Sequence, residues 1–156
     1  MASRFRRRLV TFFLVLYAAF VAVITLTPRM PGSGLLNRLV LRFLSELHRR
    51  GITWIDFLAI EFIGNVLMFL PLGLFAALLI PRRAWWSLLF LGTVSSAFIE
   101  FFQSVFLPGR VPEVRDLMSN TIGFLLGALF AISMRLLVAH RDTLVEHDRR
   151  AAVIAK

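Results

Sequence analysis

The sequence has no cysteine, so disulfide bonds, thiol catalysis and cysteine-ligated metals are excluded. Its three histidines, His48, His140 and His147, lack the spacing of a metal site, and no glycine-rich segment resembles a phosphate-binding loop. Charged residues are also scarce, at 17% of the chain. We therefore expect no metal and no other cofactor.

Hydrophobic residues dominate the 156-residue chain, at 58% with 16 phenylalanines, and the mean hydropathy is +0.79. This composition is too apolar for a soluble domain of this size. The net charge of +9 would suggest nucleic acid in a soluble chain, but most arginines lie at the ends of apolar runs, where they orient a membrane protein. The sequence predicts a single-domain, all-α integral membrane protein with no nucleic-acid partner.

Four apolar runs are long enough to cross a bilayer, over residues 9–26, 60–80, 85–107 and 117–139. The first follows a cluster of arginines, as a signal peptide also does, but no convincing small-residue cleavage site closes it. We therefore predict four uncleaved spans. The charged tail, residues 140–156, is predicted to be a short helix or disordered.

Residues 35–50 lie between the first two spans and are too short and too charged to cross the membrane. Leucines and phenylalanine recur at helical spacing on one face, while arginines occupy the other. Two placements fit this amphipathic helix. It lies in the membrane interface with its arginines at lipid phosphates, or it packs as a soluble helix against the spans.

Basic residues are more numerous on the side of the N terminus than on the opposite side, if four spans alternate in direction. The bias is strongest before the first span, which directly follows Arg4, Arg6, Arg7 and Arg8. Because basic residues favour the cytoplasmic side, we predict a multi-pass protein with both termini in the cytoplasm.

Residues 95–120 contain the densest polar chemistry between the termini, centred on Glu100 in the third span. A charged group within a span costs a few kcal/mol or more, so Glu100 is expected to face protein or trapped water. With the predicted topology, polar residues of three spans converge on the outer leaflet. The predicted site consists of Asn65, Glu100, Gln103, Arg110, Arg115, Asp116 and Asn120.

Structural roles compete with this interpretation. Glu100 would also serve as a buried, protonated carboxyl that joins helices through Asn65 or Asn120, and interhelical amides are common packing devices worth about 0.6 to 2 kcal/mol. The fourth span carries small residues every four positions, including Gly123 and Gly127, which predicts a close approach by another helix. If the protein forms a homo-oligomer, this ridge is the expected interface.

Three segments carry a resemblance to a known family: NVLMFLPLG at 65–73, SAFIEFFQ at 96–103 and RDLMSNTIGFLLG at 115–127. They resemble the VanZ-like family of small four-span bacterial membrane proteins. The resemblance implies a bacterial cytoplasmic membrane and a link to the cell envelope, because the founding member is associated with low-level teicoplanin resistance. The family-like positions are Asn65, Pro71, Gly73, Ser96, Glu100, Gln103, Arg110, Asp116, Asn120 and Gly123.

Three classes of function fit these features. The first is a non-catalytic envelope protein that binds a membrane lipid, a lipid-linked or wall-related ligand, or a membrane partner at the outer leaflet. The second is an intramembrane enzyme acting on a lipid or wall precursor, with Glu100 as the candidate catalytic acid or base. The third is a proton-linked transporter, which would need an oligomer to enclose a path. We favour the first class because no nucleophile accompanies Glu100 in the sequence.

Overall fold

The computed structural model describes residues 2–26, 35–106 and 113–154. Throughout these ranges the regular structure is helical, which confirms the predicted all-α fold. The elements are α1 (Ala2–Leu26), α2 (Leu35–Arg49), α3 (Phe57–Leu79), the short 3-10 helix η1 (Arg82–Ala84), α4 (Ser87–Phe106) and α5 (Val114–Ile154).

Four helices are long and apolar enough to cross a membrane, and they coincide with the four predicted spans. They cover Arg4–Leu26, Phe57–Leu79, Ser87–Phe106 and Val114–His147. The main difference from the sequence prediction is that α5 continues without a break through most of the charged tail. The tail stays helical because no glycine or proline interrupts it, and Arg150 Nε pairs with Glu146 Oε1 one turn earlier at 3.0 Å.

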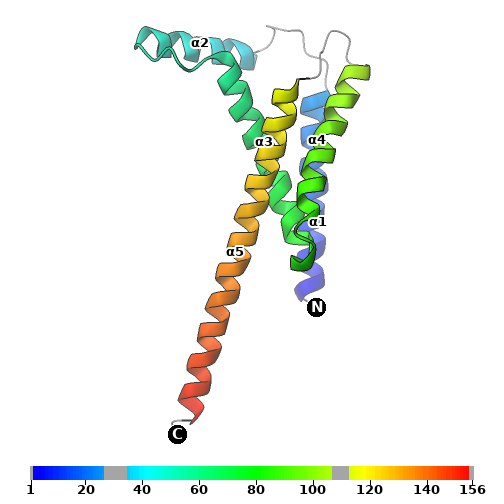
Figure 1. Cartoon of the computed structure of the whole chain (residues 1–156), viewed down its shortest axis with the longest axis vertical. Helices are drawn as coiled ribbons and strands as arrows, with labels where there is room; N and C mark the ends of the chain where they lie inside the picture. The colour runs from blue at the N-terminus through cyan, green and yellow to red at the C-terminus, as the bar shows by residue number, and fades with distance from the viewer. Residues whose placement is uncertain (1, 27–34, 107–112, 155–156) are drawn as a thin grey trace.

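The four long helices lie side by side, with both termini at one end of the bundle (Figure 1). α2 lies at the opposite end and runs across the direction of the spans (Figure 1). The most extensive packing is between α3 and α5, while α4 packs on α5 and α1 packs on α3. The beginnings of α3 and α5 therefore meet the end of α4 at the end of the bundle that carries α2.

The ridge of small residues on α5 packs against α3 of the same chain. A Cβ atom at Gly123 would lie 2.2 Å from the carbonyl oxygen of Val66, and one at Gly127 would lie 1.8 Å from that of Leu70. The two backbones therefore touch, which confirms the predicted close approach. Because α3 already covers Gly123 and Gly127, a homo-oligomer would need a different surface or a separation of these two helices.

Local signals fix the segment between α2 and α3. α2 ends at Arg49, and the chain turns at Gly51, whose φ of +86° lies in the left-handed region. The amide of Ile52 donates to the carbonyl of Leu47 at 3.0 Å. α3 then begins after Asp56, whose Oδ1 accepts the amide of Ala59 at 2.7 Å. This cap sets the start of α3 and thereby places its first turns beside the start of α5.

Candidate functional site

α4 carries a buried polar stripe formed by Ser96, Glu100 and Gln103. Their exposed fractions are 0%, 9% and 3%. The spacing of four and three residues places the three side chains on one face of the helix, as the sequence predicts. Each of them reaches a different neighbour, so the stripe joins α4 to the rest of the bundle. Ser96 is the innermost member, and its hydroxyl donates to the carbonyl of Leu117 on α5 at 3.3 Å.

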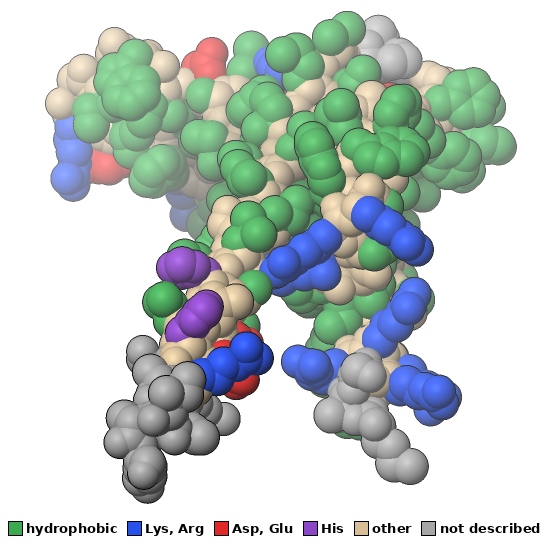
Figure 2. Space-filling view, turned by 60° about the horizontal axis from the view of Figure 1, so that its bottom comes forward, with side chains coloured by type: hydrophobic (Ala, Val, Ile, Leu, Met, Phe, Trp, Pro, Cys, Tyr) green, Lys and Arg blue, Asp and Glu red, His purple; other side chains and the backbone are tan. Residues whose placement is uncertain are grey.

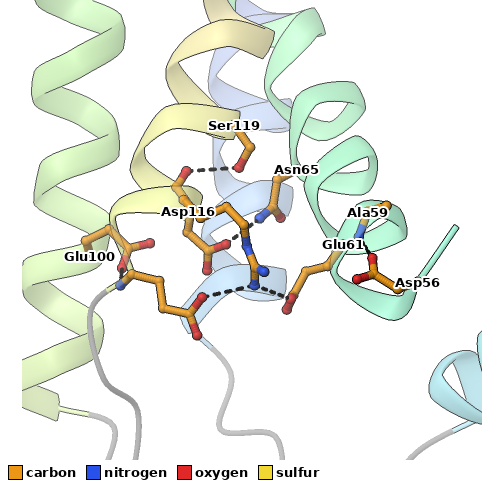
Figure 3. Close-up of polar contacts among 9 residues, drawn as sticks. Asp56, Ala59, Glu61, Asn65, Glu100, Asp116 and Ser119 are labelled. Atoms are coloured by element: carbon orange, nitrogen blue, oxygen red, sulfur yellow. Dashed lines mark hydrogen bonds and ion pairs between the residues drawn. The ribbon is translucent and has the colours of Figure 1, made fainter. Parts of the chain in front are cut away.

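The carboxylate of Glu100, which belongs to α4, lies beside the beginning of α5. Its Oε2 accepts the backbone amide of Glu113 at 3.3 Å (Figure 3). The first amides of a helix have no partner within that helix, and they form the positive end of its dipole. Glu100 therefore supplies an acceptor from α4 to the start of α5, in a position where a negative charge is favourable.

Asp116 connects α5 to α3. Its Oδ1 accepts the amide nitrogen of Asn65 at 3.1 Å, and only 8% of the residue is exposed. Its backbone carbonyl also accepts the hydroxyl of Ser119 at 3.1 Å. Asp116 lies between Glu100 and Asn65 in the close-up, so side chains from α4, α5 and α3 meet there (Figure 3).

Arg115 forms the more exposed edge of this group. Its Nη2 lies 3.1 Å from Oε2 of Glu61 and 3.0 Å from Oε2 of Glu113. The arginine side chain is 28% exposed, whereas the carboxylate of Glu113 is 55% exposed. We call Glu61, Asn65, Glu100, Arg115 and Asp116 the polar cluster. Its interior is acidic, and its guanidinium is held between two carboxylates.

Gln103 and Asn120 lie outside the polar cluster. The amide nitrogen of Gln103 donates to the carbonyl of Thr25 on α1 at 2.7 Å. Asn120 on α5 is buried, with an exposed fraction of 3%. The amide oxygens of both residues are buried without a partner among the described residues. Each is therefore an acceptor that a donor group would satisfy.

Four of the seven predicted site residues belong to the polar cluster: Asn65, Glu100, Arg115 and Asp116. Gln103 and Asn120 are buried nearby along their helices but have separate surroundings. Arg110 lies outside the described residues. The predicted site did not include Glu61, whose ion pair with Arg115 joins residues 54 positions apart. No local pattern marks such a pair, because it depends on how α3 packs beside α5.

The polar cluster is closed rather than open. Glu100 and Asp116 are each less than a tenth exposed. Two shallow surface hollows lie elsewhere, one beside the arginines at the start of α1 and one along the charged end of α5. Within the described ranges, no three histidine or acidic side chains are arranged to hold a metal ion. The cluster is therefore suited to hydrogen bonding and charge pairing, with access from the side of Arg115.

These observations define the class of protein: a four-span helical membrane protein with a buried polar cluster at the end of the bundle opposite its termini. The chain belongs to the VanZ/LLP1 family, whose model matches residues 12–137. The match includes most of α1 and all of α3 and α4, and thus extends beyond residues 65–127, where the sequence resemblance lies. No curated protein and no solved structure matches the chain.

Proposed function

We propose that this VanZ/LLP1 family protein acts on the cell envelope at the outer face of the bacterial cytoplasmic membrane. Both termini would lie in the cytoplasm, and the polar cluster would bind a lipid-linked or cell-wall-related ligand. The observation that supports this function is the convergence of Asn65, Glu100 and Asp116 from three spans at the end of the bundle away from the termini. Ionisable residues buried within membrane spans are expensive and typically functional.

The chemistry of the polar cluster suits a ligand with several N–H or O–H donors. Carboxylates and amide oxygens accept hydrogen bonds, and sugars and peptide amides of wall precursors supply the matching donors. Arg110 and Arg115 remain the proposed contacts for anionic groups. Because Arg115 is paired with Glu61 and Glu113, an anionic ligand would have to displace at least one of these carboxylates.

A complementation experiment tests the proposal. A deletion strain would receive the wild-type protein, Glu100→Gln or Asp116→Asn, and susceptibility to teicoplanin and other envelope antibiotics would be measured. Glu46→Gln on α2 is the matched control, because it is the same chemical change at a residue outside the polar cluster. We expect the two cluster variants to insert normally and lose protection, while the control keeps it.

Two results would change this conclusion. If Glu100→Gln and Asp116→Asn insert normally and protect as well as the wild type, the polar cluster is not a ligand site. If purified protein in vesicles converts a lipid or wall precursor and Glu100→Gln does not, Glu100 is a general acid or base and the protein is an intramembrane enzyme.

A further inference from the structure

Within the described residues, α2 contacts the bundle mainly on one side. It lies across the spans at the end away from the termini and extends sideways past them (Figure 1). The long helix that it contacts most is α3, the helix that follows it in the chain. At its C-terminal end, Nε2 of His48 lies 2.9 Å from the carbonyl oxygen of Ile55, which holds the connecting segment against the helix.

The apolar face of α2 is only partly covered by protein. Leu44 is buried, with 6% exposed, but Leu39 and Phe43 on the same face are 51% and 55% exposed. Trp54 in the connecting segment is 81% exposed. A soluble helix packed against the spans would bury these side chains. Their exposure beside a membrane-spanning bundle instead suits contact with lipid, and tryptophan is typical of the membrane interface.

The charges of α2 divide into two pairs of arginines. Arg49 and Arg50 both pair with Glu46. Arg38 and Arg42 lie one turn apart, are exposed, and have no ion pair within the described part of the chain. Guanidinium groups bind phosphate oxygens with two parallel hydrogen bonds. The unpaired positive charges are therefore complementary to the phosphates of a lipid surface.

We propose that α2 is a membrane-surface helix that binds phospholipid headgroups in the leaflet facing away from both termini. Leu39 and Phe43 enter the boundary of the acyl chains, and Arg38 and Arg42 bind headgroup phosphates. This choice selects the interfacial placement over the soluble one. It also fixes the depth of the polar cluster near the headgroups, because Glu61 lies in the first turns of α3, directly after α2. The proposal does not depend on what the polar cluster binds.

Spin labels test the placement of α2, and the absence of native cysteine makes single-cysteine variants of the full chain straightforward. Phe43→Cys and Ser45→Cys place labels on opposite faces of α2. After reconstitution into phosphatidylcholine and phosphatidylglycerol vesicles, we expect the label at position 43 to be accessible to oxygen and shielded from a water-soluble nickel complex. The label at position 45 is expected to show the reverse. Equal nickel accessibility at both positions would place α2 in water and overturn the proposal.

A lipid-binding measurement tests the two arginines. Full-length protein would be reconstituted into nanodiscs of mixed phosphatidylcholine and phosphatidylglycerol. After the protein is released from the nanodiscs in the mass spectrometer, native mass spectrometry would count the phosphatidylglycerol molecules that remain bound to it. Arg38→Gln with Arg42→Gln is expected to lower its preferential retention by about fivefold per arginine. The double variant Arg49→Gln with Arg50→Gln is the matched control, and its preferential retention of phosphatidylglycerol should equal that of the wild type. Unchanged retention in the first variant, or an equal loss in both, would overturn the assignment of Arg38 and Arg42.

Discussion

At the scale of single residues, glycines set the distance between α3 and α5. A Cβ atom at Gly73 would lie 1.7 Å from the carbonyl oxygen of Phe124, and one at Gly127 would lie 1.8 Å from that of Leu70. Both glycines are helical, so their role is to remove side-chain volume and not to permit an unusual φ. Lipid tails are as apolar as leucine, and close packing of this kind is a principal source of helix association in membranes.

Gly127→Ala should therefore loosen the pair of helices. We expect a loss of about 1 to 3 kcal/mol in stability, because the new methyl group overlaps a backbone carbonyl that has little freedom to move. Thermal unfolding in detergent would measure the loss. Gly64→Ala is the control, since a Cβ there has nothing within 4 Å. Equal melting temperatures for the two variants would show that the contact between α3 and α5 is not as close as described.

The hydrogen bond between Asn65 and Asp116 makes a second prediction at this scale. In a double-mutant cycle with Asn65→Ala and Asp116→Ala, we expect a coupling energy of about 1 kcal/mol, as measured for interhelical hydrogen bonds in membranes. Asn65→Ala combined with Ser104→Ala should be additive, because the exposed Ser104 hydroxyl bonds only to its own helix in the described chain. No coupling between Asn65 and Asp116 would argue against their bond.

At the scale of elements, polar side chains satisfy the ends of neighbouring helices. Glu100 accepts an amide at the start of α5, and Gln103 donates to Thr25 in the last turn of α1. Arg135 of α5 satisfies the end of α3, because its Nη1 donates to the carbonyls of Ala77 and Ile80 at 2.7 and 3.0 Å. Water is absent from the bilayer core, so backbone groups freed at helix ends need partners within the protein.

Arg135→Leu should destabilise the end of α3. The carbonyl of Ala77 would normally accept the amide four residues later, but that residue is Pro81, which has no amide hydrogen. We expect a loss of about 1 to 3 kcal/mol in stability, since a partly buried carbonyl loses its donor. Arg141→Leu is the control, because Arg141 is exposed and pairs only with the adjacent Asp142 in the described chain. A similar fall in unfolding temperature for both variants would contradict the capping role.

At the scale of the whole molecule, the two ends of the bundle differ in chemistry. Arginine side chains gather around the end that carries the termini (Figure 2). The other end carries α2 and the acidic interior of the polar cluster. This asymmetry is what the positive-inside rule produces in a protein with an even number of spans. It supports the proposed orientation with both termini in the cytoplasm.

Accessibility labelling would test this orientation in intact cells. Ser45→Cys on α2 and Thr143→Cys near the end of α5 both replace exposed residues. We expect a membrane-impermeant maleimide to label position 45 in intact cells and position 143 only after the membrane is opened. The reverse pattern would invert the topology and move the polar cluster to the cytoplasmic face.

The fold was more predictable from sequence than the polar cluster. The spans follow from local runs of apolar residues, and the α2 helix follows from its spacing of leucines and arginines. The partners of Glu100 and Gln103 were not predictable, because both side chains bond to backbone groups, and every residue carries the same backbone groups. Similarly, the sequence placed Arg115 in the predicted site but could not show that Glu61 and Glu113 hold its guanidinium.

By itself, the sequence determined that this chain is an all-α protein with four spans, that its polar residues gather near residues 95–120, and that it resembles the VanZ-like family. The tertiary structure decided which of these residues meet. It joined Asn65 to Asp116, set the carboxylate of Glu100 beside the start of α5, and packed Gly123 and Gly127 against α3 of the same chain. Hydrophobic length and periodicity are properties of a segment, whereas contacts between helices depend on how two segments are aligned and rotated against each other.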